Sequence, residues 1–227
     1  MIAEAIQKIK SELPEGVQLV AVSKFHPVEA LAEAYAAGQR IFGESHVQEL
    51  TAKCPLLPAD IEWHFIGHLQ TNKVKPLVAH VSLIHAIDSD HLLHEVSKQA
   101  LRAGRRVDCL LQLHVAQEET KFGFTPGEAI EYVESGVWRQ LEGVRLAGIM
   151  CMASNTDDVR QIRSEFRLAA QTYRQLRDAI AASAADDEAA CAFRHLSMGM
   201  SHDWHIAVEE GATLVRIGTT IFGERQY

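Results

Sequence analysis

Residues 17–43 read VQLVAVSKFHPVEALAEAYAAGQRIFG, and this stretch predicts a strand, a helix and a second strand in succession. Its first seven residues are rich in Val and Leu, as expected of a strand buried on both faces. Pro27 then stands near the start of a helical pattern that places Val28 and Leu31 on one face, and Gly38 follows the end of that pattern. The unit therefore predicts two parallel strands joined by a crossover helix.

The same alternation of β-rich runs and helical patterns recurs along the whole chain. An amphipathic helix comes first, the longest helix opens at the capping cluster 156–158, and the Ala- and Asp-rich residues 181–190 are expected to form an exposed connection. Eight strands are expected, at residues 17–23, 40–43, 61–66, 83–87, 107–115, 145–150, 193–198 and 214–217.

Eight such units can close into a barrel or form an open doubly wound sheet. No GxGxxG or GxxxxGK[ST] motif follows any of the expected strands, which removes the usual support for the open sheet. A chain of 227 residues suits one barrel, since a typical barrel takes roughly 250 residues. We therefore predict the α/β class, with residues 1–227 forming a single (β/α)₈ TIM-barrel domain.

Composition excludes several classes of partner. The chain carries 22 basic and 30 acidic residues, for a net charge of −8, which argues against nucleic acid because phosphate neutralisation needs clustered Lys and Arg. No stretch is long and apolar enough to span a membrane, and the first ten residues lack the features of a signal peptide. We expect neither nucleic acid nor a membrane as a partner.

Cysteine and histidine spacing gives no sign of a metal. Cys54, Cys109, Cys151 and Cys191 lie far apart without a CxxC pair, which argues against a disulfide scaffold or a zinc ribbon and predicts a reducing, cytoplasmic location. The close histidine pairs, such as that in 64–68, join no third ligand in a recognisable motif. We expect no metal site.

Lys24 is the first candidate functional residue, because it closes the first expected strand. In a barrel, the carboxyl ends of the strands and the loops that follow them converge on one face, where functional residues gather. A lysine at a strand end can simply lay its apolar stem along the surface and keep its ammonium in water. In an interior position, desolvation would lower the lysine pKa and free the neutral amine to attack an aldehyde or ketone.

Two segments near the end of the chain are typical of a phosphate site. Residues 197–201 read SMGMS and precede a predicted helix, and residues 216–220 read RIGTT and close the last strand. Barrels frequently bind phosphate at the loops after strands seven and eight, through the amides at helix N-termini. Ser201 is expected to cap the helix, and Gly218 and Thr219 to offer backbone N–H groups. Each feature is common without a ligand, and the segments indicate a site only together with the strand-end lysine.

A series of motifs, in this order and at these spacings, resembles the pyridoxal phosphate homeostasis protein family. The motifs are VSK at 22–24, GES at 43–45 with VQE at 47–49, HFIGHLQTNK at 64–73, ETKFG at 119–123, LAGIMCM at 146–152, LSMGMS at 196–201, and VRIGT at 215–219 with IFG at 221–223. The resemblance covers nearly the whole chain. The ordered series is far more specific than any one of its motifs.

The resemblance implies a barrel similar to the N-terminal domain of alanine racemase, the type III fold of pyridoxal phosphate proteins. It also implies that pyridoxal 5′-phosphate is held as a Schiff base on Lys24. Phosphate contacts are implied for Ser201, Gly218 and Thr219, with Ser197 as a further candidate.

Two more positions are carried over from the family. Arg216 matches an arginine that faces the pyridine nitrogen, where a cation disfavours protonation of that nitrogen and weakens the ring as an electron sink. Many members read Gly-Glu-Asn where this chain reads GES at 43–45. A ring contact carried over to Ser45 therefore keeps a hydroxyl and loses an amide.

Three functions are compatible with a Schiff-base lysine. The family resemblance favours a non-catalytic carrier that buffers pyridoxal phosphate or delivers it to pyridoxal-phosphate-dependent apoenzymes. The alternative is a small pyridoxal-phosphate-dependent enzyme such as an amino-acid racemase. A third possibility is a barrel aldolase that forms a Schiff base directly with a sugar phosphate, which predicts a colourless protein where the cofactor predicts a yellow one.

The choice between carrier and racemase depends on a second proton-transfer group. Racemisation needs acid/base groups on both faces of the substrate carbanion. In alanine racemases the second group is a tyrosine from a second domain and a partner subunit, and this sequence ends at Tyr227. We therefore expect a carrier of the cofactor, active in vitamin B6 homeostasis as a cytoplasmic monomer.

Overall fold

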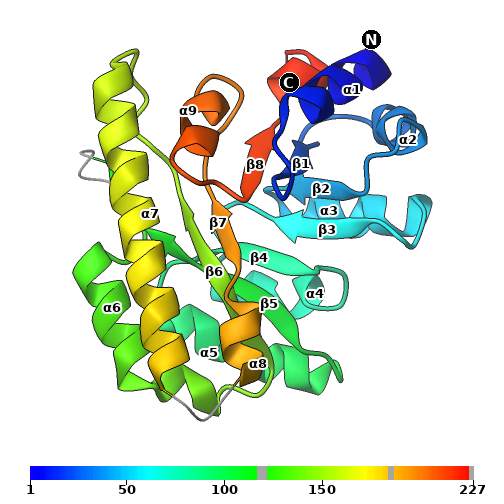
Figure 1. Ribbon diagram of the computed structural model, residues 1–227. Helices are drawn as coiled ribbons and strands as arrows, with labels where there is room; N and C mark the ends of the chain where they lie inside the picture. The colour runs from blue at the N-terminus through cyan, green and yellow to red at the C-terminus, as the bar shows by residue number, and fades with distance from the viewer. Residues whose placement is uncertain (117–121, 184–186, 225–227) are drawn as a thin grey trace.

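The computed structural model describes residues 1–116, 122–183 and 187–224, and in them eight parallel strands close into a barrel (Figure 1). The strands follow one another around the barrel in chain order, and the eighth pairs with the first. They are β1 (Gln18–Val22), β2 (Ile41–Glu44), β3 (Glu62–Phe65), β4 (Leu83–Ile87), β5 (Val107–Leu113), β6 (Val144–Cys151), β7 (His195–Ser197) and β8 (Leu214–Ile217). The closed barrel confirms the predicted fold, and the open sheet is excluded.

Helices connect successive strands on the outside of the barrel (Figure 1). They are α1 (Ile2–Glu12), α2 (Val28–Ala36), α3 (Val47–Lys53), α4 (Val74–Leu77), α5 (Asp90–Arg102), α6 (Pro126–Ser135), α7 (Val159–Ala182), α8 (Asp187–Ala192), α9 (Trp204–Glu209) and α10 (Thr219–Phe222), with 3₁₀ turns η1 (Cys54–Leu56), η2 (Thr71–Lys73) and η3 (Val137–Gln140). The first helix, α1, packs against the last, α10. None of the helices in the described ranges is long and apolar enough to cross a membrane.

Two helix predictions can be compared with the structure. The capping cluster at 156–158 does start a helix, because the Asp158 carboxylate accepts hydrogen bonds from the backbone N–H groups of Arg160 and Gln161 at the start of α7. The exposed connection expected at 181–190 is exposed at 181–183 and at Glu188, but Ala189 is buried, and the segment includes the end of α7 and the start of α8. Alanine is the best helix former, and the Ala-rich composition favours this outcome.

Strand alternation separates the residues inside the barrel from those that face the helices. A small apolar cluster fills the interior and includes Val20 of β1, Leu110 of β5 and Leu214 of β8, whereas their neighbours in sequence belong to the larger core beneath the helices. On several strands, the next inward-facing residue toward the carboxyl end is polar. On β8, for example, Arg216 follows the interior residue Leu214 by two positions. The apolar layer therefore closes the lower interior and leaves a polar layer at the carboxyl ends of the strands.

Candidate functional site

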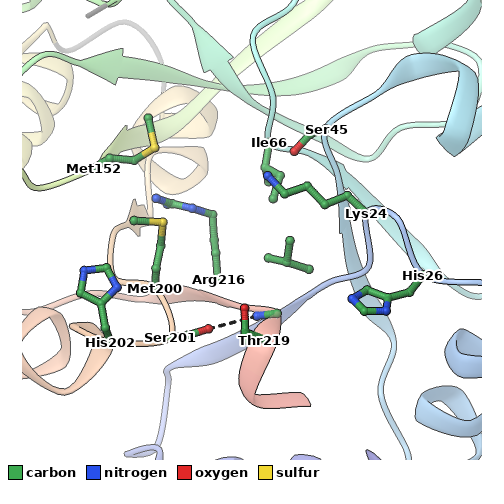
Figure 2. A pocket seen from close by; sticks show the side chains of 12 residues that line it. Lys24, His26, Ser45, Ile66, Met152, Met200, Ser201, His202, Arg216 and Thr219 are labelled. Carbon is green, nitrogen blue, oxygen red and sulfur yellow. Dashed lines mark hydrogen bonds between the residues drawn. The ribbon is translucent and has the colours of Figure 1, made fainter. Parts of the chain in front are cut away.

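A pocket of about 230 Å³ opens at the carboxyl ends of the strands (Figure 2). Its walls come from both ends of the chain, because β1 and β8 are neighbours in the closed barrel. Six of the seven predicted site residues line it: Lys24, Ser45, Ser201, Arg216, Gly218 and Thr219. The seventh, Ser197, lies below Arg216 and is fully buried.

Lys24 reaches the pocket because it continues the alternation of β1, in which every second side chain points into the barrel. Val20 is in the interior cluster, Val22 lines the pocket, and Lys24 follows two residues later. Figure 2 shows its half-buried side chain extending across the pocket, with the amine beside Ile66 and Ser45. Lys24, at the end of the first strand, therefore points into the pocket and does not lie along the outer surface of the barrel.

The backbone around Lys24 forms a tight turn. The N–H of His26 donates to the carbonyl of Ser23 over 3.2 Å, and Phe25 between them has a positive φ of 67°. A positive φ at the third residue is typical of a type II turn, where glycine is the usual occupant. Phenylalanine in that conformation is strained, and such strain often accompanies functional sites.

Arg216 projects inward from β8 and is only 5% exposed. One guanidinium nitrogen, Nη1, donates to the Ser197 hydroxyl over 2.6 Å, and the other, Nη2, donates to the Cys151 carbonyl over 2.9 Å. Burial lowers the pKa of Arg216, but an arginine stays cationic in proteins. The pocket therefore contains a fixed positive charge on a rigidly held side chain.

Ser197 begins a buried chain of hydrogen bonds that runs through the barrel interior. Its hydroxyl lies 2.9 Å from His85 Nδ1, and His85 Nε2 lies 3.0 Å from His64 Nδ1. Burial lowers the pKa of His85 far below its usual range and that of His64 to about 3, so both rings are neutral.

The Ser197 hydroxyl has two neighbours in this chain. It accepts a hydrogen bond from Arg216, which can only donate, and it also bonds to Nδ1 of His85, in a direction that depends on the tautomer of the ring. Ser197 is therefore held by the protein on two sides.

The opposite end of the pocket is built from the loops after β7 and β8. The Ser201 hydroxyl accepts from the backbone N–H of Gly218 over 3.4 Å, and Figure 2 shows Ser201 and Thr219 close together. Gly218 lies so close to β1 that an added Cβ would come within 3.0 Å of the Val22 carbonyl oxygen. Glycine permits this approach of the two strand ends.

The expected helix cap at Ser201 is wrong. The residue preceding α9 is Asp203, and the Asp203 carboxylate accepts the backbone N–H of Met200 over 2.5 Å. Ser201 lies two residues too early to cap the helix, and its hydroxyl turns to Gly218.

Other residues that line the pocket were not identified from the sequence. They include His26, whose ring stacks on Phe222 with centroids 5.0 Å apart, and His202 and Met200 from the loop after β7. Met152 lies at the end of β6 and is 37% exposed. Met152 and Met200 lie within the family-like motifs, whereas His26 and His202 carry no pattern in sequence that separates them from ordinary loop residues.

A buried charged cluster beneath Lys24 was also missed. Lys53, at the end of α3, pairs with Glu44 of β2 and Glu49 of α3 and is 8% exposed in its side chain. Burial raises the pKa of Glu44 to about 7, although Lys53 and Ser23 lower it in part. Glu44 and Glu49 lie within the family-like motifs, whereas the sequence gives no signal that Lys53 is buried.

The histidines and cysteines assemble no metal site within the described ranges, where no group of three or more His, Cys, Asp or Glu could hold an ion. His64 turns into the barrel, whereas His68 stacks on Phe122 with centroids 4.2 Å apart and pairs with Asp88 over 3.2 Å. Cys151 is fully buried and forms no disulfide. Of the ETKFG motif at 119–123, residues 119–121 lie outside the described residues.

Comparison with known proteins gives consistent matches over the full length. Residues 1–226 match the family described as alanine racemase, N-terminal domain. The chain is 40% identical to the pyridoxal phosphate homeostasis protein of Aquifex aeolicus, covering 100% of this chain and 96% of that one. It is 37% identical to the protein of the same name from Vibrio alginolyticus, covering 94% and 89%.

Solved structures agree with these matches. PipY of Synechococcus elongatus is 37% identical and covers 98% of this chain and 100% of its own, with a TM-score of 0.89 without PLP and 0.85 with PLP bound. Alanine racemase from E. faecalis is 19% identical with a TM-score of 0.73, and this chain covers 57% of it. The second likeness is one of fold alone.

Proposed function

The chain belongs to the pyridoxal phosphate homeostasis protein family, and from that premise we propose that it binds pyridoxal 5′-phosphate as a Schiff base on Lys24 and acts as a carrier of the cofactor. One observation carries the proposal. A half-buried lysine and the two loops that resemble a barrel phosphate site line the same pocket, with a buried arginine in its wall.

The residues at one end of the pocket fit a phosphate group. Gly218 and Thr219 stand at the start of α10, where the first backbone N–H groups of a helix have no partner within the helix. The hydroxyls of Ser201 and Thr219 add further donors. Ser201→Ala is expected to weaken binding of pyridoxal phosphate and to leave binding of pyridoxal, which has no phosphate, unchanged.

Lys24 fits the role of the covalent attachment point. Its neutral amine would attack the aldehyde carbon, a C=N bond would form, and the aldehyde oxygen would leave as water with the two amine hydrogens. The reverse step needs only water, so attachment is reversible. Reversible attachment without consumption of a second substrate is what a carrier requires.

Arg216 favours the carrier over an enzyme. A guanidinium facing the pyridine nitrogen disfavours its protonation, and the bound cofactor would then stabilise carbanions weakly. We assign Ser197 to Arg216 as a positioning residue in place of the phosphate contact that the resemblance implied, because Ser197 is fully buried below the pocket lining and its hydroxyl accepts from Arg216. Ser45 remains a proposed ring contact, since it lines the pocket beside the lysine amine.

A racemase is the second candidate, and the two pocket histidines favour it. His26 and His202 line the same pocket as Lys24 and could supply a second proton-transfer group. The test is exchange of α-protons from a panel of L-amino acids into D₂O by the cofactor-loaded protein. We expect no exchange above that of free pyridoxal phosphate, and rapid exchange that Lys24→Ala abolishes would establish the enzyme.

We further propose that the functional unit is a monomer, formed by residues 1–227 as a single domain, that serves apoenzymes in the cytoplasm. The four cysteines form no disulfide with one another, which supports a reducing location. Sedimentation tests the monomer. Transfer is tested by mixing the loaded protein with an apoenzyme, which we expect to regain activity faster than free cofactor at the same concentration allows.

A further inference from the structure

The charged cluster beneath Lys24 lies outside the pocket, and no step of the proposed function uses it. Its centre is the ammonium of Lys53, whose three hydrogens match three acceptors. The ammonium nitrogen lies 2.8 Å from Glu44 Oε1, 2.6 Å from Glu49 Oε1 and 2.8 Å from the backbone carbonyl oxygen of Ser23. The last contact links the cluster directly to the residue before Lys24.

The same cluster holds the Lys24 turn at two further points. Glu49 Oε1 accepts the backbone N–H of Phe25 over 2.6 Å, and Glu44 Oε1 accepts the Ser23 hydroxyl over 2.7 Å. Residues on both sides of Lys24 are therefore bound to carboxylates that Lys53 brings together. The carboxylates come from β2 and α3, which fixes the turn to the barrel wall.

The conformation that these bonds hold is unfavourable by itself. Phe25 has a φ of 67°, and a side chain with a Cβ rarely adopts this left-handed region. If the bond from the Phe25 N–H were lost, the turn could relax toward an extended conformation. Since Lys24 is the neighbouring residue in the turn, its side chain would then leave the direction shown in Figure 2.

We propose that Lys53 is a positioning residue for Lys24: by bridging Glu44, Glu49 and the Ser23 carbonyl, it holds the strained turn that directs the Lys24 amine into the pocket. This inference rests on the proposed function, because the task of the turn is to present Lys24 to the cofactor aldehyde. A direct chemical role for Lys53 does not arise, since all three of its hydrogens are engaged away from the pocket.

The first test uses the cofactor-free protein and reads the turn itself. In Lys53→Met, the Phe25 amide is expected to exchange with D₂O about tenfold faster or more, as for loss of a charge-assisted hydrogen bond. Lys98→Met is the matched control, because it removes a lysine from an exposed ion pair with Glu95. The Phe25 amide should exchange in that variant as in the parent.

A second pair of variants separates positioning from a general loss of stability. Glu49→Ala removes the acceptor of the Phe25 N–H, whereas Glu49→Gln keeps a carbonyl oxygen there. Glu49 is partly exposed, so both variants are expected to fold even if Lys53→Met does not. Glu49→Ala should accelerate Phe25 exchange and slow Schiff-base formation about tenfold, and Glu49→Gln should restore most of both.

A third variant tests whether the backbone strain at Phe25 connects the charged cluster to the position of Lys24. Asparagine tolerates the left-handed region better than phenylalanine, so Phe25→Asn should recover part of the Schiff-base rate that Lys53→Met or Glu49→Ala loses. No recovery, or equal damage from Glu49→Gln and Glu49→Ala, would show that the cluster acts otherwise and would overturn the inference.

The two proposals fail in distinguishable ways. If borohydride fixes the cofactor on Lys24 in the parent protein, and Lys53→Met and Glu49→Ala match the parent in Phe25 exchange and Schiff-base rate, the inference alone is wrong. If the parent forms no adduct on Lys24, the proposed function is wrong and the positioning role falls with it.

Discussion

At the scale of single residues, Ser197 shows how a hydroxyl near a binding site can serve the protein itself. It joins a buried cation to a chain of two neutral imidazoles. Ser197→Ala would remove the partner of Arg216 Nη1 and of His85 Nδ1, and we expect a loss of about 1–3 kcal/mol in the free energy of unfolding. Urea denaturation measures this loss.

Cofactor binding by the same variant distinguishes the two roles of Ser197. If the hydroxyl positions Arg216, the variant should distinguish pyridoxal phosphate from pyridoxal as well as the parent does. A selective loss of affinity for the phosphorylated form would restore Ser197 as a phosphate contact, and Ser201→Ala is the comparison in which we expect that selective loss.

Glu44 gives a prediction about pH. Its side chain is fully buried, its Oε2 atom has no hydrogen-bond partner in the part of the chain that the structure describes, and burial raises its pKa from 4.5 to about 7. The unfolded state therefore releases its proton at lower pH than the folded state does. The contribution of Glu44 to stability is fully present below about pH 4.5 and is lost as pH rises to about 7, by about 3 kcal/mol in total.

Glu44→Gln isolates this effect, because it cannot titrate. The free energy of unfolding of the parent minus that of Glu44→Gln should fall between pH 4.5 and 7.5. Glu49 and the exposed His46 are the same in both proteins, so their contributions largely cancel in the difference. A difference that rises with pH would mean that attraction to Lys53 outweighs burial and holds the Glu44 pKa below its usual value.

How much the sequence could predict at this scale depended on the kind of residue. Lys24 and the loops with Ser201 and Gly218 could be found, because strand ends and phosphate loops have local patterns. The burial of Lys53 could not, because a charged residue at the end of a helix looks the same in sequence whether it faces water or a carboxylate. The place of Ser197 depended on strand register, which no local pattern specifies.

At the scale of elements, the loop after β3 and the loop after β2 approach each other closely at the pocket. A Cβ on Gly67 would lie 2.3 Å from the backbone oxygen of Ser45, and backbone cannot move aside as a flexible side chain can. Gly67→Ala should therefore cost about 2 kcal/mol or more in the free energy of unfolding and displace Ser45. Thermal unfolding measures the first effect.

Gly127→Ala is the matched control. Gly127 lies in α6 with no atom within 4 Å of an added Cβ, and alanine is the better helix former, so this variant should be neutral or more stable by up to about 1 kcal/mol. Equal stability of the two variants would contradict the close packing of the two loops.

All eight strands could be located from the sequence, because a run of β-branched residues and a helical repeat differ in period. The expected bounds at 83–87 and 214–217 are those of the observed strands, whereas the bounds of the other six strands differ by one residue or more. The strand expected at 107–115 ends at Leu113 in the structure. The N–H of the next residue, His114, donates a hydrogen bond to the carbonyl of Phe124 in the following segment. Tertiary pairing, and not local composition, sets that boundary.

At the scale of the whole molecule, closure of the barrel is what creates the site. Lys24 and the pair Gly218–Thr219 are separated by nearly the full chain, and they meet because β8 pairs with β1. The number of strands and the order of the motifs predicted this meeting. The buried hydrogen-bond chain that begins at Ser197 and the charged cluster around Lys53 could be found only in the three-dimensional structure.

The most direct test of the account is borohydride reduction of the protein loaded with pyridoxal phosphate, followed by intact mass and peptide mapping. We expect a mass increase of one reduced phosphopyridoxyl group per chain, located on Lys24, and none in Lys24→Ala. A group fixed mainly on another lysine, or no adduct in a folded protein, would contradict the claim that the amine at the end of β1 holds the cofactor.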